Sequence, residues 1–162
     1  MPESPHASEF RVEKRRVEAT ITLSNGETAR GCFFVAGSGP LSEEPERVGQ
    51  LLNLDDPLFP FERADEGRPV TVLYNRAHVV LVSLSDPEAR RVPGYEVATP
   101  RRVSLLLSSG SRIAGTVRVY RPEGRDRVSD WARDPSMFRY VETDAATLLV
   151  NVNHIVEVRE EA

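Results

Sequence analysis

Apolar and polar positions alternate along most of the chain and are interrupted by short glycine-containing turns. Asn25-Gly26 and Ser109-Gly110 each stand between two such alternating segments, and glycine readily supplies the positive φ of tight hairpin turns. The pattern therefore predicts two β-hairpins, with strands at residues 16–23 and 27–36, and at 102–107 and 111–120. Gly31 and Gly115 lie inside the second strand of each pair, where glycine commonly marks a sharp bend or a bulge.

Shorter apolar segments predict six further strands, at residues 59–63, 69–74, 78–84, 137–143, 146–150 and 154–159. Two sets of apolar residues instead follow the i, i+3, i+4 spacing of a helix face: Val48, Leu51 and Leu52, and Val128, Trp131 and Ala132. Ser42 is a plausible start for the first helical segment. Strands dominate, so the chain is predicted to be all-β.

The same landmarks occur twice in the same order. ATITLSNGETARG (19–31) corresponds to VSLLLSSGSRIAG (103–115), and LYNRAHVVLV (73–82) corresponds to LVNVNHIVEV (149–158). We interpret this as an internal duplication. It predicts a disordered tail at 1–10, a first domain at 11–84, a linker at 85–100 and a second domain at 101–160.

The hairpin pattern resembles the first signature of Sm-like proteins. Leu23, Gly26 and Gly31 fit it, and Leu107, Gly110 and Gly115 fit it again, while the strand–turn–strand segments 73–82 and 149–158 occupy the place of the second signature. The resemblance implies two tandem, strongly bent, five-stranded small barrels, each with a short helical insert, packed against each other as a pseudo-dimer. The insert followed by Asp-Pro resembles an uncharacterised group of bacterial Sm-like domains.

The residues by which Sm proteins bind RNA have no counterpart in this sequence. The Asp-x-x-Met-Asn element is absent after the second strand of either hairpin, and the last turns read Asn75-Arg76-Ala77-His78 and Asn151-Val152-Asn153-His154. The resemblance therefore implies the fold without the RNA pocket. Fold alone does not assign a function in any case.

Composition narrows the classes of function. The 162 residues carry a formal charge of −4, which argues against a generic nucleic-acid binder. A single cysteine, three histidines and the absence of a nucleophile elbow or a phosphate-binding loop predict no enzyme, no metal site and no cofactor. Apolar segments are too short to span a bilayer and no secretory signal is visible, so we expect a cytoplasmic protein without a membrane partner.

The two last turns contain the first candidate binding residues, Asn75, His78, Asn151 and His154. A carboxamide and a histidine at a turn could bind a nucleotide base or a carboxylate. The structural alternative, which we favour, is that asparagine shapes the turn and histidine bonds to nearby backbone.

Arginine is concentrated in the second copy, where residues 101–140 hold nine arginines and four acids, whereas residues 1–84 hold nine bases and thirteen acids. This asymmetry suits a polyanion, an acidic protein or the acidic half of another copy, or it is a solvated face. The candidate binding residues here are Arg101, Arg102, Arg118, Arg121, Arg125, Arg127 and Trp131. Trp131 is also expected in the core under the helical inserts, together with the aromatic residues Phe59, Phe61, Phe138 and Tyr140, and any of them that is exposed would be an anchor for a partner.

The sequence predicts a non-enzymatic protein–protein interaction or adaptor module. Edge strands of incompletely closed barrels invite pairing with a protein partner or with another copy in a homo-oligomer. An RNA- or polyanion-binding Sm-like protein is the alternative. A third interpretation, a cyclic-dinucleotide receptor, rests on Arg11 and Arg15, whose Arg-x-x-x-Arg spacing resembles a PilZ domain without its companion motif.

Overall fold

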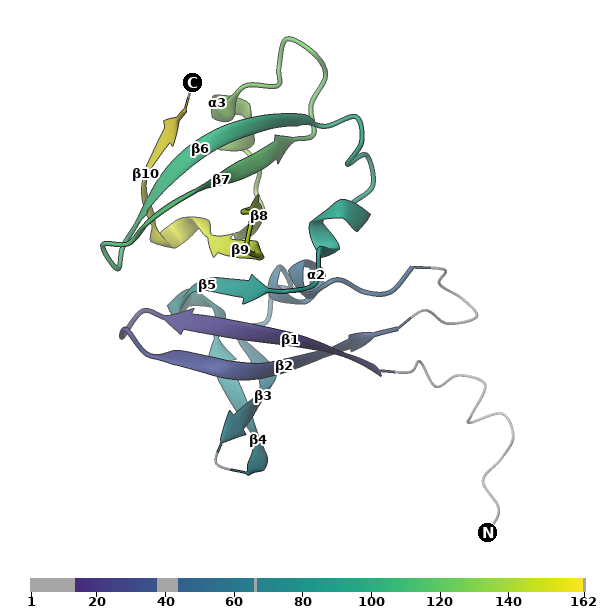
Figure 1. The fold of residues 1–162 in the computed structure, drawn as a ribbon, viewed down its shortest axis with the longest axis vertical. Coiled ribbons are helices and arrows are strands. Elements are labelled where there is room, and N and C mark those ends of the chain that lie inside the picture. Colours follow the sequence, from purple (N-terminus) through teal and green to yellow (C-terminus); the bar gives the residue numbers. More distant parts are fainter. Residues whose placement is uncertain (1–13, 38–43, 66, 162) are drawn as a thin grey trace.

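The computed structural model describes residues 14–37, 44–65 and 67–161, so the predicted tail at 1–10, Arg11 and Ser42 lie outside the described residues. Over the described residues the fold is all-β, as the sequence predicts. Ten strands form one open antiparallel sheet (Figure 1). The strands are β1 (Lys14–Leu23), β2 (Thr28–Ala36), β3 (Leu58–Asp65), β4 (Arg68–Asn75), β5 (Val79–Leu84), β6 (Thr99–Leu107), β7 (Arg112–Val119), β8 (Phe138–Glu142), β9 (Thr147–Asn151) and β10 (Ile155–Glu160).

Short helical elements connect some of the strands. The helix α2 (Val48–Leu52) lies between β2 and β3, and α3 (Val128–Trp131) lies between β7 and β8. Three 3-10 turns, η1 (Arg76–His78), η2 (Glu88–Arg91) and η3 (Val152–His154), precede β5, β6 and β10.

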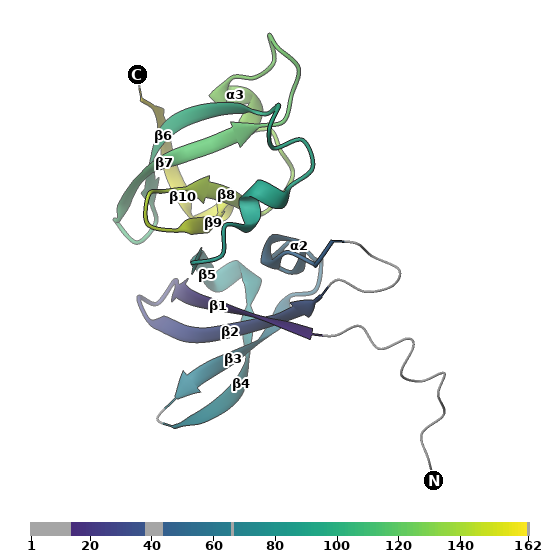
Figure 2. The ribbon, with the colours of Figure 1, turned by 45° about the vertical axis from the view of Figure 1, so that its right-hand side comes forward.

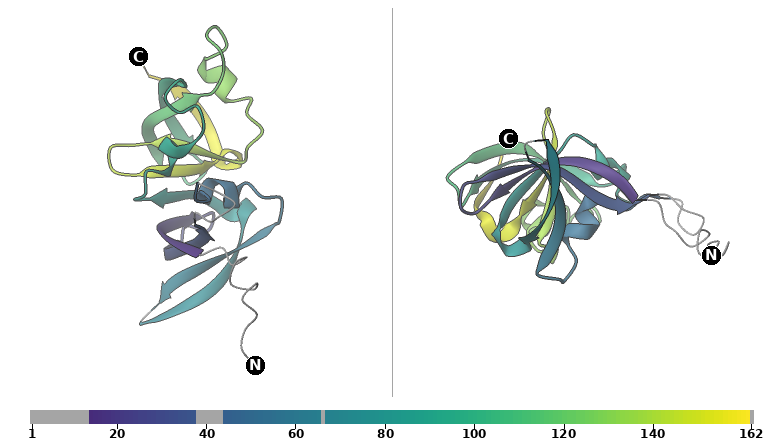
Figure 3. Two further views of the ribbon diagram at one scale, coloured as in Figure 1. Left: turned by 90° about the vertical axis from the view of Figure 1, so that its right-hand side faces the viewer. Right: turned by 90° about the horizontal axis from the view of Figure 1, so that it is seen from below.

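The strand order is β10-β6-β7-β8-β9-β5-β1-β2-β3-β4. One end of the molecule holds β10, β6, β7, β8 and β9, and the other end holds β5, β1, β2, β3 and β4. Strand β5 lies at the boundary between the two ends (Figure 2). Both halves share one pairing scheme: β1 pairs with β2 and β5, and β6 pairs with β7 and β10. The β3–β4 hairpin extends from one end of the molecule (Figure 3).

Hydrogen-bonded pairing runs without interruption from one half into the other, because β5 pairs with β9. The sequence predicts two tandem five-stranded barrels packed against each other. In the structure, the described strands form a single open sheet with one edge at β4 and the other at β10.

The two hairpin turns adopt the predicted backbone geometry, with φ of +90° at Gly26 and +88° at Gly110. Gly31 and Gly115, where the sequence predicts a sharp bend or a bulge, lie where the next strand approaches closely. A Cβ on Gly115 would lie 2.7 Å from the carbonyl oxygen of Glu142, and a Cβ on Gly31 would overlap the carbonyl oxygen of Glu62. Glycine at these positions therefore lets the next strand cross at close range, so that β2 turns onto β3 and β7 onto β8.

Each half has its own apolar core, and each core receives side chains from the other half. Phe59, Phe61 and Phe138 are buried, as predicted. Phe138 and Leu149 belong to the core of the first half, although both lie in the second half of the sequence. Val80 from β5 packs in the core of the second half. The boundary is therefore an exchange of core residues as well as a strand pair.

Candidate functional site

The four candidate residues at the last turns shape those turns. Asn75 Oδ1 accepts a hydrogen bond from the backbone N–H of Ala77 at 2.9 Å, and Asn151 Oδ1 accepts one from Asn153 at 2.9 Å. Each histidine lies beside the serine of the neighbouring hairpin turn. Nδ1 of His78 is 3.0 Å from Ser24 Oγ, and Nδ1 of His154 is 2.8 Å from Ser108 Oγ. These contacts support the structural interpretation of both turns.

Asn151 and His154 also join the two halves. Asn151 is fully buried, and its Nδ2 donates to the carbonyl oxygens of Arg76 at 3.2 Å and Val79 at 2.9 Å. Nε2 of His154 lies 2.8 Å from the carbonyl oxygen of Ala77. A carbonyl oxygen only accepts, so Nε2 carries the proton in this contact. The second turn therefore fixes the first half against the second.

The junction between β5 and β9 has a defined register. Leu81, Val82, Ser83 and Leu84 lie opposite Val150, Leu149, Leu148 and Thr147 in that order. Every residue of β9 is buried, and four of the six residues of β5 are buried. A strand in the middle of a sheet, covered on both faces, reads as a continuous apolar run. TLLVN and VVLVSL both have this character.

The two outer strands, β4 and β10, are the counterparts of β9 and β5 in the strand order, but they are exposed. Tyr74 alone is buried in β4, and no residue of β10 is buried. Leu73 in β4 is 61% exposed and Val156 in β10 is 65% exposed. An unpaired strand presents a row of backbone N–H and C=O groups that can pair with another chain. The two edges are the main candidate interaction site of the described residues.

The candidate arginines do not form one patch. Arg101 is paired with Asp126, and Arg118 lies between the Tyr95 ring and Glu142. Arg102 is exposed, and its Nη1 lies 3.5 Å from Thr116 Oγ1. Arg121, Arg125 and Arg127 are exposed in the segment between β7 and α3. Arg101 and Arg118 are thus neutralised by neighbouring carboxylates. The other group, Arg121, Arg125 and Arg127, lies together on one connecting segment.

Trp131 is buried in the second core and carries the guanidinium of Arg139 over its ring, 4.9 Å from the centroid. Arg139 donates to backbone carbonyls of the segment that follows α3, among them those of Trp131, Asp134 and Ser136. Burial lowers the pKa of Arg139. Trp131 and Arg139 therefore hold this segment, and the indole is not available as a surface anchor.

Arg76 holds the segment that follows α2 in the first half, as Arg139 holds the segment that follows α3, but it does so from another position in the chain. It is buried, and it donates to the carbonyl oxygens of Leu51 at 2.7 Å, Leu52 at 3.0 Å and Leu58 at 3.1 Å, with a further contact to that of Asp56. Burial lowers its pKa, as it does for Arg139. Neither arginine is free to bind an anion.

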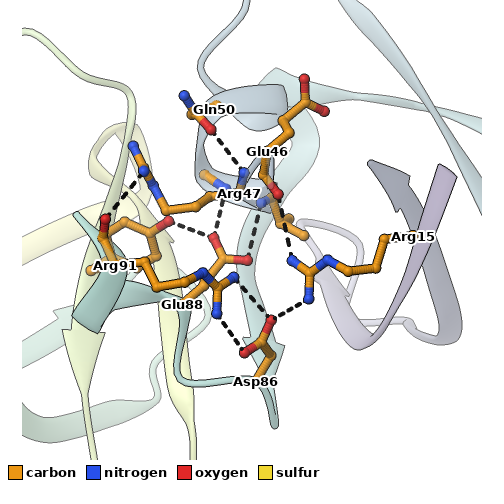
Figure 4. Close-up of polar contacts among 10 residues, drawn as sticks. Arg15, Glu46, Arg47, Gln50, Asp86, Glu88 and Arg91 are labelled. Atoms are coloured by element: carbon orange, nitrogen blue, oxygen red, sulfur yellow. Dashed lines mark hydrogen bonds and ion pairs between the residues drawn. The ribbon is translucent and has the colours of Figure 1, made fainter. Parts of the chain in front are cut away.

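A buried polar cluster around Glu88 was not foreseen from the sequence (Figure 4). Glu88 lies in the segment expected to be a linker, yet it is fully buried. Its two carboxylate oxygens accept hydrogen bonds from the backbone N–H groups of Val48 and Gly49, both at 3.0 Å, at the start of α2. The hydroxyl of Tyr140, from β8, donates to the same carboxylate. Glu88 therefore connects the linker, the first half and the second half.

The surroundings of Tyr140 are tightly constrained. Burial, with the Glu88 carboxylate beside it, raises the pKa of the Tyr140 phenol well above its usual range. A Cβ on Gly49 would overlap the Tyr140 hydroxyl, so only glycine fits there without displacement. The sequence around Glu88 gives no local signal for these contacts, because its partners Val48 and Tyr140 lie 40 and 52 residues away along the chain.

Asp86 forms a second polar link, between β1 and the segment at residues 85–100. It accepts two hydrogen bonds from Arg91, at 3.1 and 3.2 Å, and one from Arg15 at 3.1 Å. Arg15, one of the two arginines of the PilZ-like spacing, is thus already occupied by a carboxylate. The hydrogen bonds from Arg91, together with that from Arg15, hold the pKa of Asp86 below its usual value despite partial burial.

This depressed pKa predicts a specific acid sensitivity. The ionised Asp86 contributes stability above its unfolded-state pKa of about 3.9, and the contribution is lost as pH falls through the lower folded-state pKa. We expect Asp86→Asn to be less stable than wild type at neutral pH and to show a flatter loss of stability below about pH 4. Urea unfolding at a series of pH values measures this. Parallel curves for the two proteins would contradict it.

A cleft of about 430 Å³ lies between the halves, with Arg118, Tyr120 and Tyr140 among its lining residues. Arg118 is paired with Glu142, and Tyr140 with Glu88, so these polar groups already have protein partners. Among residues 14–37, 44–65 and 67–161, no group of three or more histidine, cysteine or acidic residues could hold a metal ion.

Within the same described part of the chain, no helix has the length and apolar character to cross a membrane. Comparisons with family models, with curated proteins and with solved structures find no match to this chain.

Proposed function

We propose that this chain is a non-enzymatic protein-interaction module made of two Sm-like barrels, and that it binds a protein partner along the free edges of its sheet. The observation that carries the proposal is the state of β4 and β10. Both are unpaired on one side in the strand order, and both expose a large apolar side chain. Strand addition to an open edge gives affinity through main-chain hydrogen bonds and specificity through alternate side chains.

The two-barrel part of the proposal is supported by the strand pairing. In each half the first strand pairs with the second and the fifth, and a glycine in the second strand allows a close crossing by the third. The final turns of the halves repeat the same asparagine cap and histidine–serine contact. These repeated features favour two related five-stranded units.

From Val70 onward, the β4 edge differs from the edges of proteins that avoid pairing. Natural edge strands are commonly blunted by lysine, proline or covering loops. Between Val70 and Asn75, β4 has no charged residue and no proline, and it exposes Val70 and Leu73. A single exposed apolar side chain needs no explanation. Two exposed apolar side chains on one unpaired strand, beside backbone groups without a strand partner, favour an interaction surface.

A charge placed on an edge should abolish partner binding without unfolding the chain. We expect Leu73→Lys or Val156→Lys to lower partner capture at least about tenfold, which is 1.4 kcal/mol of binding free energy. Val97→Lys, the same change at a position that is 87% exposed and outside the strands, should leave capture unchanged. Quantitative mass spectrometry of proteins retained by each tagged variant, with wild type as reference, measures the effect. Equal capture by all four proteins would contradict the proposal.

Binding of RNA or another polyanion is the second candidate, and the exposed Arg121, Arg125 and Arg127 favour it. Phosphate contacts release counterions, so such binding falls steeply as salt is raised. Co-purified nucleic acid that is removed by high salt, and that is lost when these three arginines are replaced by glutamine, would support this function. Insensitivity of partner capture to salt would support the edge-binding function instead.

A further inference from the structure

The cleft between the halves contains an arginine that has no acidic partner among the described residues. We propose that this cleft binds a small organic acid, whose carboxylate is held by the guanidinium of Arg47 and whose apolar body lies against the aromatic and aliphatic walls. The cleft has a volume of about 430 Å³, which lies in the range of pockets that hold small molecules. It is separate from the sheet edges of the proposed function.

Arg47 is the N-cap residue of α2, and its backbone and side chain make different contacts. The backbone N–H donates to Oε1 of Gln50 at 2.8 Å. The side chain extends away from α2 to the linker, where Nη1 lies 3.5 Å from the carbonyl oxygen of Arg91 (Figure 4). This distance is long for a hydrogen bond. The guanidinium is therefore held by one weak contact.

The remaining donors of Arg47 lack partners. A guanidinium has five N–H donors and no acceptor. Nε is buried without a hydrogen-bond partner, and none of the acidic residues that the structure describes forms an ion pair with this side chain. A charge that is partly removed from water and left unpaired is costly. A ligand carboxylate beside the Nη groups would supply the missing negative charge.

The other charged side chains that line the cleft already have partners. Arg118 bonds to Glu142, and Arg139 donates to backbone carbonyl oxygens. Asp134 accepts a hydrogen bond from the backbone N–H of Ser136 at 2.8 Å. Among the charged lining residues, three arginines therefore face two acids, and the unpaired charge is positive.

Glu88 does not neutralise Arg47. Its carboxylate accepts from the backbone N–H groups of Val48 and Gly49 and from the hydroxyl of Tyr140. The Tyr140 hydroxyl is thus directed to Glu88 and is no acceptor for the ligand. A single unpaired guanidinium matches a single negative charge, whereas a phosphate monoester carries nearly two. The charge balance favours a carboxylate.

Tyr120 supplies a second, neutral donor in the same cleft. It follows β7 directly and is 44% exposed. Desolvation raises the pKa of its hydroxyl, although the nearby Arg118 and Arg47 lower it in part, so the phenol keeps its proton at neutral pH. A guanidinium beside a phenol O–H presents donors only. Such a pair selects a group that only accepts, as an ionised carboxylate does.

The walls of the cleft are suited to an apolar body. Val92 and Pro93 from the linker, Trp131 from α3 and Phe138 from β8 are among the lining residues. Small-molecule pockets commonly combine such walls with a few polar groups that fix the orientation of the ligand. Removing apolar ligand surface from water adds to the affinity. The ligand class is therefore an aromatic or branched aliphatic carboxylic acid.

A fluorescence titration tests this. Trp131 lines the cleft and is the only tryptophan of the chain, so its emission reports on occupancy. The probes are phenylacetate, 3-phenylpropanoate and 4-methylpentanoate, each compared with its primary amide. At least one acid should bind saturably, and its uncharged amide should bind about tenfold more weakly or less. Equal binding of acid and amide, or no saturation at millimolar acid by fluorescence and calorimetry alike, would overturn the proposal.

Two substitutions locate the carboxylate. Arg47→Gln should weaken acid binding about tenfold or more and leave amide binding unchanged. Arg90→Gln is the matched control, because Arg90 is an exposed arginine of the linker that does not line the cleft, and it should bind as wild type does. Tyr120→Phe keeps the ring and removes one neutral donor, so the loss should be about two- to tenfold. Unchanged acid affinity in Arg47→Gln and Tyr120→Phe would refute the assignment.

The end of a polypeptide carries the same carboxylate, and a peptide pair separates the two sources. A short peptide ending in phenylalanine is titrated with a free and with an amidated C-terminus. Binding of the free peptide when none of the acids binds would overturn the small-acid proposal and assign the cleft to a chain end. Leu73→Lys and Val156→Lys should bind the acids as wild type does, because neither residue lines the cleft. Failure at the edges and failure at the cleft are thus seen in different variants.

Discussion

Replacing Glu88 by alanine is expected to lower the free energy of unfolding by about 4 kcal/mol. The carboxylate accepts hydrogen bonds from two backbone N–H groups of α2 and from the Tyr140 hydroxyl, and it is fully buried. Each buried donor left without an acceptor costs about 1–3 kcal/mol. For a domain of this size the loss corresponds to a fall in Tm of roughly 8–16 °C, measured by calorimetry or by circular dichroism.

Two variants separate this specific effect from a general one. Glu96→Ala changes an exposed glutamate of the same linker and should alter stability by less than about 0.5 kcal/mol. Tyr140→Phe removes one of the three donors and should cost about 1–2 kcal/mol. In the Glu88→Ala background the same tyrosine change should cost much less, since the partner is already gone. Glu88→Ala as stable as Glu96→Ala would show that Glu88 does not join the halves.

Asn151→Asp is expected to destabilise the chain by about 3 kcal/mol or more at neutral pH. Nδ2 of Asn151 donates to two carbonyl oxygens at a fully buried position. Aspartate would place a carboxylate oxygen against those carbonyls, and a buried charge without a donor is costly. Equilibrium urea unfolding of the variant and of wild type at neutral pH measures the effect.

Asn75→Asp is the matched control, because it makes the same change at the corresponding exposed turn. Oδ1 of the new aspartate can still accept from Ala77, as Asn75 does. The cost to the single chain should therefore stay within about 0.5 kcal/mol. Equal destabilisation by the two variants would contradict the role assigned to Asn151 between the halves.

The Asn151→Asp penalty should also depend on pH. Burial against carbonyl oxygens disfavours the charged form, so the folded-state pKa of the new carboxyl is raised above its unfolded value. The folded chain then binds the proton more tightly than the unfolded chain. The penalty should be smallest below about pH 4 and grow as pH rises above the unfolded-state pKa.

The strands and turns could be predicted because they depend on neighbours in the sequence. Gly26 and Gly110 mark hairpins through a backbone preference that acts over two residues, and their φ values agree with it. The all-β class follows from the same alternation. The apolar character of Phe59, Phe61 and Phe138 alone predicts that they lie in the core, and all three are buried there.

The pairing of β5 with β9 depends on a contact that no local pattern specifies. A signal was present in the comparison of related segments: VVLVSL is almost entirely apolar, whereas its counterpart IVEVRE alternates with charges. A continuous apolar run indicates burial on both faces, and alternation indicates one solvated face. This contrast points to β5 as an interior strand and β10 as an edge.

Glu88, Arg76 and Arg139 could not be recognised from sequence. Each bonds backbone groups of segments that the fold brings close, and backbone partners leave no trace in the identity of the residues concerned. The two arginines hold equivalent segments from different positions, Arg76 from η1 and Arg139 from β8. Because Arg76 and Arg139 are not at corresponding positions of the two copies, an alignment of the copies does not reveal the role that the two arginines share.

The exchange of core residues has a consequence for synthesis on the ribosome. Phe138 and Leu149 complete the core of the first half, and they emerge from the ribosome after all five strands of that half. Domains of a growing chain commonly fold in order from the N-terminus. Here the first half cannot finish before β9 has left the exit tunnel. A nascent chain stalled after β5 should therefore remain sensitive to protease, although all of its own strands have been made.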